Sequence, residues 1–209
     1  MKKLGKLLLI NCILAIILQV IPEGKIEITY TYKEQVQTIV LASITKEETE
    51  RAVAEMLAKN YSLTLDTDLR TKSNLTADDY NSLLRNTYLD GIGEALEKAE
   101  QQYNVNGLYL MGLCIVESGW GTSSFAINRN NLVGWNAIDS NPNQATTFKS
   151  KEECILHVAS KLQSNYLTEN GIYFEGYTPK DIDVHYCTDK LHANKIVNTI
   201  NCLIKERIW

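Results

Sequence analysis

The feature that most constrains the fold of this chain is an almost wholly apolar segment, residues 107–116, that leads into Glu117. Leu110, Leu113, Cys114 and Glu117 recur at helical spacing, which predicts a buried helix with the carboxyl group at its end. An ionised carboxylate is costly to bury, and the usual result is that such a group keeps its proton near neutral pH. A protonated carboxyl group in a cleft can serve as a general acid, although a plain helix-end role would give the same pattern.

The residues after this helix carry a family resemblance. Glu117 is followed by Ser-Gly-Trp-Gly-Thr-Ser, and the run Asn-Asn-Leu-Val-Gly-Trp extends from Asn130 to Trp135. These motifs resemble those of bacterial peptidoglycan N-acetylglucosaminidases of glycoside hydrolase family 73, which include many autolysins. The resemblance covers the chain from about Thr76 onward. It implies a lysozyme-like fold and an endo-β-N-acetylglucosaminidase that cleaves the β-1,4 bond between N-acetylglucosamine and N-acetylmuramic acid in peptidoglycan.

The resemblance also implies catalytic residues. The essential glutamate of the family corresponds to Glu117, the expected general acid. A second carboxylate in the hairpin has been assigned as the base, and Asp139 is the acidic residue of the hairpin predicted here, although a turn-forming role explains it equally well. Glu152 and Glu153 lie nearby but suit the capping of a helix. A substrate-assisted route, in which the N-acetyl group attacks, would need no protein base.

Sugar binding requires aromatic faces, and two residues are candidates for it. Trp135 lies in the predicted hairpin. Tyr186 lies in a segment, residues 184–189, that resembles the Tyr-Ala-x-Asp segment of the family, with Cys187 in place of the alanine. The resemblance places this tyrosine in the active site.

The periodicity of apolar residues predicts a mainly α-helical domain with one small β-hairpin lobe. The hairpin is expected from two short apolar stretches, residues 132–137 and 145–148, separated by the turn signal Asp-Ser-Asn-Pro-Asn. The predicted helices begin at Thr76, near Ile92, at Asn106, at Ser150 and near Lys190.

The N-terminal part is expected to direct the chain out of the cytoplasm. Lysines 2, 3 and 6 precede an apolar run over residues 7–21, the pattern of a signal peptide or membrane anchor, expected to be a hydrophobic helix within residues 1–24. Without a small-residue cleavage site, an uncleaved anchor is favoured. Residues 25–75 are predicted to form an extracytoplasmic stalk with an extended stretch over 25–41 and a helix after Thr45, and residues 76–209 the catalytic domain.

Composition disfavours several other functions. The net charge of −4 gives no support for nucleic-acid binding. No cysteine or histidine spacing indicates a metal site, and we expect no cofactor; His157, His185 and His192 are each interpreted as surface or packing residues. The expected partner is the glycan strand of peptidoglycan, with the membrane as a second partner if the N-terminal helix is retained. Two alternatives remain: a lytic transglycosylase, and a wall-binding or assembly protein that has no activity.

Overall fold

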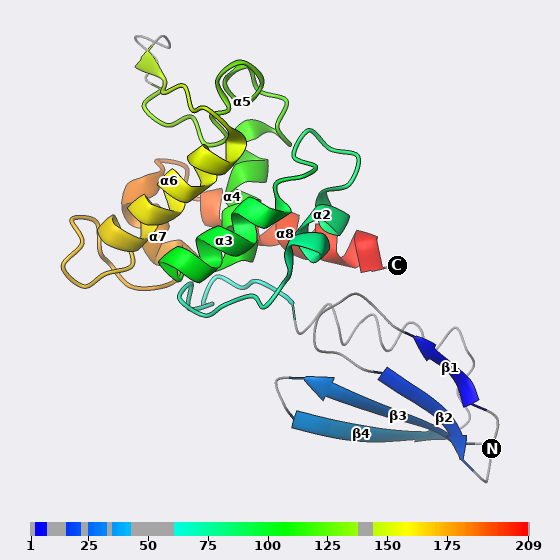
Figure 1. Cartoon of the computed structure of the whole chain (residues 1–209). Coiled ribbons are helices and arrows are strands. Elements are labelled where there is room, and N and C mark those ends of the chain that lie inside the picture. Colours follow the sequence, from blue (N-terminus) through cyan, green and yellow to red (C-terminus); the bar gives the residue numbers. More distant parts are fainter. Residues whose placement is uncertain are drawn as a thin grey trace. The chain divides into compact units, whose positions relative to one another are not determined.

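The computed structural model describes the backbone of four strands in the N-terminal part, and residues 61–137 and 144–208. The chain divides into two compact units, residues 1–59 and residues 60–208. Figure 1 labels the elements of both units.

The N-terminal unit contains an antiparallel sheet of four strands in the order β1-β2-β3-β4. The strands are β1 (Lys3–Leu7), β2 (Ile16–Ile21), β3 (Lys25–Tyr32) and β4 (Gln35–Ala42). In the register of the central pairs, Ile28 lies opposite Leu18 of β2 and opposite Ile39 of β4. Of the extended stretch predicted over residues 25–41, residues 25–32 and 35–41 are therefore confirmed as strands.

The hydrophobic helix predicted within residues 1–24 is wrong for the residues that the structure describes there, because β1 and β2 occupy them. Short apolar runs do not distinguish a helix from a strand by periodicity alone, and the β-branched residues of Ile-Ile-Leu-Gln-Val-Ile favour a strand. Within the described ranges, no helix has the length and apolar character needed to cross a membrane. The helix predicted after Thr45 lies outside the described residues.

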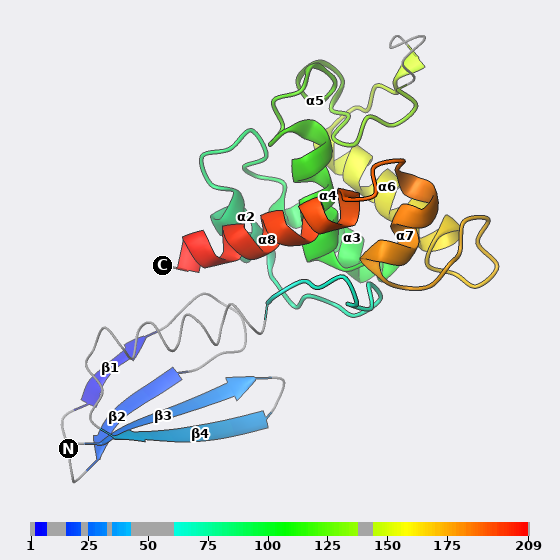
Figure 2. The ribbon, with the colours of Figure 1, turned by 180° about the vertical axis from the view of Figure 1, so that it is seen from behind.

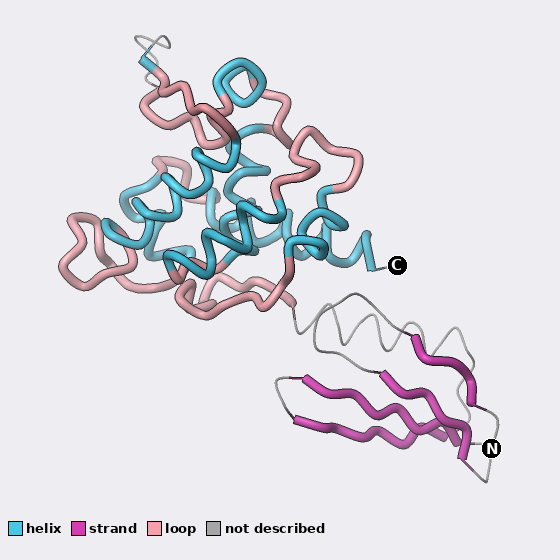
Figure 3. The backbone as a smooth tube through the Cα atoms, in the orientation of Figure 1, coloured by secondary structure: helices cyan, strands magenta, loops and turns pink. Residues whose placement is uncertain are grey.

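The second unit is helical, and Figure 3 shows only helices and loops among its described residues. Its helices pack in the pairs α3–α6, α4–α8, α2–α3, α3–α4, α2–α8 and α7–α8. Their bounds are α2 (Ala77–Leu84), α3 (Gly93–Tyr103), α4 (Gly107–Ser118), α5 (Ser124–Arg129), α6 (Lys151–Asn165), α7 (Pro179–Tyr186) and α8 (His192–Ile208). The predicted helices correspond to α2, α3, α4, α6 and α8; α5 and α7 were not predicted.

Helix α4 is the centre of this unit. All of its residues from Gly107 to Ile115 are buried, and Figure 2 shows α8 running across it. Close approach is possible because Gly112 has no side chain: a Cβ at this position would lie 2.8 Å from atoms of both Ile196 and Ile200 of α8. The buried apolar face of α8 predicted from the sequence is thus packed against the helix that ends near Glu117.

Side-chain caps fix the starts of the helices. Thr76 and Asp79 form a capping box at α2, the side chain of Asn106 accepts a hydrogen bond from the backbone of Tyr109 at α4, and the side chain of Ser150 accepts one from Glu153 at α6. Each cap satisfies backbone N–H groups that have no partner inside the helix.

The helical unit begins before the predicted boundary at residue 76. Leu63, Leu69 and Leu75 are buried within it. The backbone of Leu69 donates a hydrogen bond of 2.8 Å to Tyr177 and accepts one of 2.7 Å from Asn106. Residues 60–75, assigned to the stalk from the sequence, are therefore part of the helical unit.

The predicted β-hairpin is not formed in the described residues 131–137 and 144–148. The backbone of Thr146 donates one hydrogen bond, 3.0 Å long, to Trp135, but a regular ladder is missing from these residues. Gly134 and Asn136 have positive φ angles, which interrupt an extended strand. The fully buried side chain of Asn131 connects the two stretches instead, because it donates hydrogen bonds of 3.0 Å to the carbonyls of Trp135 and Thr146.

Candidate active site

Glu117 lies in the last turn of α4, at a helix end that its sequence fixes closely. Gly119 takes up the left-handed conformation, with φ of +56°, and its N–H donates to the carbonyl of Ile115. The hydroxyl of the buried Ser118 donates to the carbonyl of Cys114 and accepts a hydrogen bond of 2.7 Å from the backbone of Gly121. The chain therefore turns away immediately after Glu117, whose side chain is 26% exposed.

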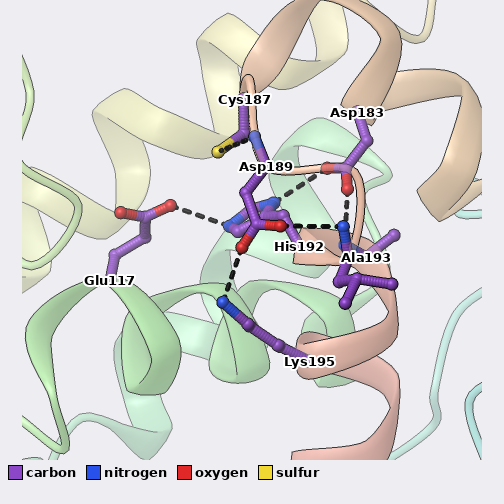
Figure 4. Close-up of polar contacts among 8 residues, drawn as sticks. Glu117, Asp183, Cys187, Asp189, His192, Ala193 and Lys195 are labelled. Atoms are coloured by element: carbon purple, nitrogen blue, oxygen red, sulfur yellow. Dashed lines mark hydrogen bonds and ion pairs between the residues drawn. The ribbon is translucent and has the colours of Figure 1, made fainter.

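A buried histidine lies between Glu117 and a second carboxylate (Figure 4). In His192, the first residue of α8, Nε2 is 2.8 Å from Oε1 of Glu117 and Nδ1 is 2.8 Å from Oδ1 of Asp183 in α7. The other oxygen of Asp183 accepts a hydrogen bond from the backbone N–H of Ala193. The side chains of His192 and Asp183 are only 5% and 11% exposed. Helices α4, α7 and α8 thus bring one imidazole ring and two carboxyl groups together.

The electrostatic balance at His192 favours the charged ring. Burial lowers its pKa, but the hydrogen bonds to Asp183 and Glu117 and the charges of both carboxylates outweigh burial and raise the pKa to about 10. An imidazolium donates from both ring nitrogens, which is what two carboxylate acceptors require. We therefore assign His192 as positively charged near neutral pH.

Tyrosine rings surround this cluster. The ring of Tyr186 stacks on His192 with a centroid distance of 5.5 Å and an interplanar angle of 13°. Tyr186 also contacts Tyr166, which in turn contacts Tyr173. Burial, and then the charge of Glu117, raises the pKa of Tyr186 well above its usual value, so its hydroxyl stays neutral. Of the residues predicted for the site, Glu117 and Tyr186 thus converge on His192.

The other predicted residues lie elsewhere. Trp135 lies in the loop region after α5, where it contacts the edge of His157 of α6 at a centroid distance of 4.8 Å. Asp139 lies outside the described residues. Glu152 forms an ion pair with Lys98 at 2.7 Å, and Glu153 accepts a hydrogen bond from the backbone of Lys149 at the start of α6. Both glutamates therefore have structural partners.

The sequence interpretation missed His192 and Asp183. His192 was interpreted as a surface or packing residue, yet it lies four residues before Ile196 on the buried face of the last helix. A histidine at such a position was a usable signal, because a buried polar group needs partners. For Asp183 no comparable signal existed, since α7 was not predicted.

The geometry gives no support for a metal centre in the parts of the chain that the structure describes. Among residues 61–137 and 144–206, no group of three or more histidine, cysteine, aspartate and glutamate side chains is placed to hold a metal ion. What the cluster offers chemically is a partly exposed carboxyl group with a cation behind it.

Comparison with known proteins identifies similar sequences and structures. A protein of Streptococcus pneumoniae named "Putative endo-beta-N-acetylglucosaminidase" is 30% identical over 139 residues, which are 64% of this chain and 21% of that protein. The chain thus spans about a fifth of the length of the curated relatives that it matches.

Solved structures with similar folds include two proteins of Staphylococcus aureus. Staphylococcus aureus autolysin E has a TM-score of 0.55 at 17% identity, with 84% of this chain and 82% of that chain covered. A catalytic mutant of autolysin E in complex with the disaccharide NAG-NAM has a TM-score of 0.55 at 19% identity, with 73% and 78% covered. S. aureus glucosaminidase B has a TM-score of 0.51 at 17% identity, with 90% and 81% covered.

The family model described as mannosyl-glycoprotein endo-β-N-acetylglucosaminidase matches residues 93–205, more than half of the chain. The matched region contains α3 to α7 and most of α8, and with them Glu117, Asp183 and His192. The chain belongs to the glucosaminidase family of glycoside hydrolases.

Proposed function

We propose that this chain hydrolyses the β-1,4 bond between N-acetylglucosamine and N-acetylmuramic acid in peptidoglycan, with Glu117 as the general acid. The observation that carries the proposal is the position of the Glu117 carboxyl group at the end of α4, partly exposed and bonded on one side to the buried His192. Family membership supports a glycosidase, and a structure similar in fold, autolysin E, has been solved with the disaccharide NAG-NAM.

The chemistry requires a proton and a water molecule. Glu117 would protonate the glycosidic oxygen as its bond to C1 of N-acetylglucosamine breaks, so that N-acetylmuramic acid leaves with a free hydroxyl group. Water would then add a hydroxyl group to C1, and its remaining proton would return the acid to its starting state. The products carry reducing N-acetylglucosamine ends.

The group that assists the water is a second proposal. Asp139 remains our candidate from the sequence, and attack by the N-acetyl group of the substrate is the alternative. Glu152 is a weaker candidate because Lys98 already neutralises it. Comparing Asp139→Asn with Glu152→Gln distinguishes them: a large loss in the first alone supports Asp139, and activity in both supports the substrate-assisted route.

We also propose that Tyr186 and Trp135 bind sugar. Tyr186 supports His192 from one side, close to Glu117, so its ring edge would border the reacting sugar. Trp135 would bind a neighbouring sugar from the loop region after α5, where its ring contacts that of His157. Replacing either by Ala should raise KM for peptidoglycan; unchanged kinetics in both variants would exclude these roles.

Product analysis tests the main proposal. The full chain and its Glu117→Gln variant are incubated with purified peptidoglycan, and the released fragments are identified by mass spectrometry. We expect reducing N-acetylglucosamine ends from the wild type and none from Glu117→Gln, whereas Glu169→Gln, an exposed glutamate bonded to Tyr177, should match the wild type. Ends of 1,6-anhydro-N-acetylmuramic acid would show a lytic transglycosylase, and full activity of Glu117→Gln would refute the role of that residue.

The proposed substrate lies outside the cytoplasm, so we propose that the chain acts there. Export directed by residues 1–24 stays a prediction, as does the retention of these residues as a membrane anchor. Mass spectrometry of the N-terminus of the protein recovered from the cell envelope tests both: an intact residue 1 supports an anchor, and a new N-terminus near residue 24 supports a cleaved signal peptide.

A further inference from the structure

The function proposed above assigns no step of the chemistry to His192, although this residue is bonded directly to Glu117. Both of its ring nitrogens are bonded to carboxylates at 2.8 Å, and its side chain is almost fully buried. A charged group is costly to bury, and the desolvation can exceed the attraction between the partners. Apolar residues of the same size could stabilise the fold as well as this cluster does, although removing one of its members would be destabilising. A role in the chemistry therefore explains the cluster better.

Several contacts fix the orientation of the ring. Asp183 accepts from Nδ1 with one oxygen and from the backbone N–H of Ala193 with the other, so it connects the ring to the first turn of α8. The stacked ring of Tyr186 restricts rotation out of the plane. Consequently Nε2–H is directed at Oε1 of Glu117. Figure 4 shows the other carboxyl oxygen of Glu117 turned away from His192.

The surroundings keep His192 as the cation that faces Glu117. Besides Glu117, α4 contributes Tyr109, which interacts with both carboxylates and whose pKa burial raises well above its usual value; α7 contributes Asp183 and Tyr186. From the loop before α8, Asp189 adds a negative charge, but it is paired with Lys195 at 2.5 Å. The tyrosines are neutral, so the direct charges on the ring are the two carboxylates.

We infer that His192, anchored by Asp183, is a positioning residue for Glu117. Its Nε2–H holds Oε1 so that the other oxygen is presented to the glycosidic bond, and its positive charge stabilises the carboxylate that remains after Glu117 has given up its proton. The proton transferred is that of Glu117, and His192 keeps both of its own throughout. This inference rests on the proposed function, because it assigns the group behind the proposed acid.

The consequence is a characteristic change in the kinetic parameters. An interaction made only in the transition state lowers kcat when it is removed and leaves KM unchanged. The charge of His192 acts on the carboxylate that develops on Glu117, so its removal should lower kcat about tenfold to a hundredfold without a change in KM.

The test measures kcat and KM on purified peptidoglycan for the wild type, His192→Gln and Asp183→Asn. His192→Gln removes the charge and keeps an amide donor, and Asp183→Asn keeps the shape of the anchor. We expect a lower kcat with an unchanged KM in both variants, and a smaller loss of kcat in Asp183→Asn. His185→Gln is the matched control, since His185 forms an exposed pair with Glu175.

A raised KM with an unchanged kcat would indicate a purely structural role and overturn the inference, and so would wild-type kinetics in both variants. If His192→Gln does not fold, the ¹⁵N shifts of the His192 ring in the wild type decide: a doubly protonated ring near neutral pH supports the inference, and a neutral tautomer overturns it. Activity in Glu117→Gln would instead refute the proposed function, so the two failures are distinguishable.

Discussion

Replacing His192 by Gln should change how the stability of the helical unit depends on pH. The rise in the pKa of His192 from 6.5 to about 10 in the folded protein corresponds to about 5 kcal/mol of preference for the charged ring. Because the ring is 5% exposed, water screens this interaction little. The amide of Gln retains one hydrogen bond to a carboxylate, worth about 2 kcal/mol. We therefore expect the variant to lose about 3 kcal/mol in free energy of unfolding at mildly acidic pH.

The direction in which the stability contribution of His192 changes with pH follows from proton binding. Between the pKa of 6.5 in the unfolded chain and about 10 in the folded one, the native state binds one more proton at this residue than the unfolded state does. The contribution of His192 is therefore complete below pH 6.5 and decreases by about 1.4 kcal/mol per pH unit as pH rises through this window. Above a pH of about 10 the stabilising effect of the charge is lost.

The assay is urea unfolding of the full chain, followed by far-UV circular dichroism across this pH window. Taking the difference between wild type and His192→Gln cancels the tyrosines and lysines that titrate in the same range. His185→Gln serves as the reference, since an exposed His–Glu pair contributes less than about 1 kcal/mol. A wild-type advantage that stays constant or grows with rising pH would refute the assignment of a buried imidazolium.

Three further substitutions test the packing around the site, each by urea unfolding. Gly112→Ala should destabilise the protein by about 1 to 2 kcal/mol, because crowding of Ile196 and Ile200 outweighs a helix-propensity gain of about 1 kcal/mol; equal or greater stability would contradict the close contact. Glu100→Gln should cost about 1 to 3 kcal/mol, since the two backbone N–H groups that donate to this buried carboxylate would face a neutral amide oxygen, and an unchanged midpoint would show the negative charge to be dispensable. Asn131→Ala should cost about 2 to 4 kcal/mol and raise KM, because three hydrogen bonds of the lobe are lost; wild-type KM would separate the lobe from substrate binding.

The elements that could be predicted are those whose signals are local. Thr76 and Ser150 were identified as helix starts because a cap needs only a hydroxyl group and the backbone of the next turn. The apolar face of α8 was predicted from the helical spacing of its apolar residues, and it is buried at Ile196 and Ile200. Glu117 was singled out because a carboxyl group directly follows an apolar helix, and its contact with His192 shows that it does have a buried polar partner.

The features that could not be predicted depend on contacts between distant residues. His192 and Glu117 are 75 positions apart, and no local pattern indicates that their side chains meet. The lobe was predicted as a hairpin because its apolar stretches flank a turn, but the side chain of Asn131 takes over the bonds that a strand ladder would make. The strand β2 was predicted as helical because its pairing with β3 is invisible in the run itself.

The packing of α4 against α8 connects the core of the helical unit to its site. Gly112 meets Ile196 and Ile200, while five residues further along α4 Glu117 meets His192, so both contacts belong to one interface between the two helices. A hydrogen bond of 2.8 Å tolerates only a small displacement of either helix before it weakens. Crowding at Gly112 would move α8 relative to α4 and lengthen the bond between His192 and Glu117. We therefore expect Gly112→Ala to lower kcat even at temperatures where the protein stays folded.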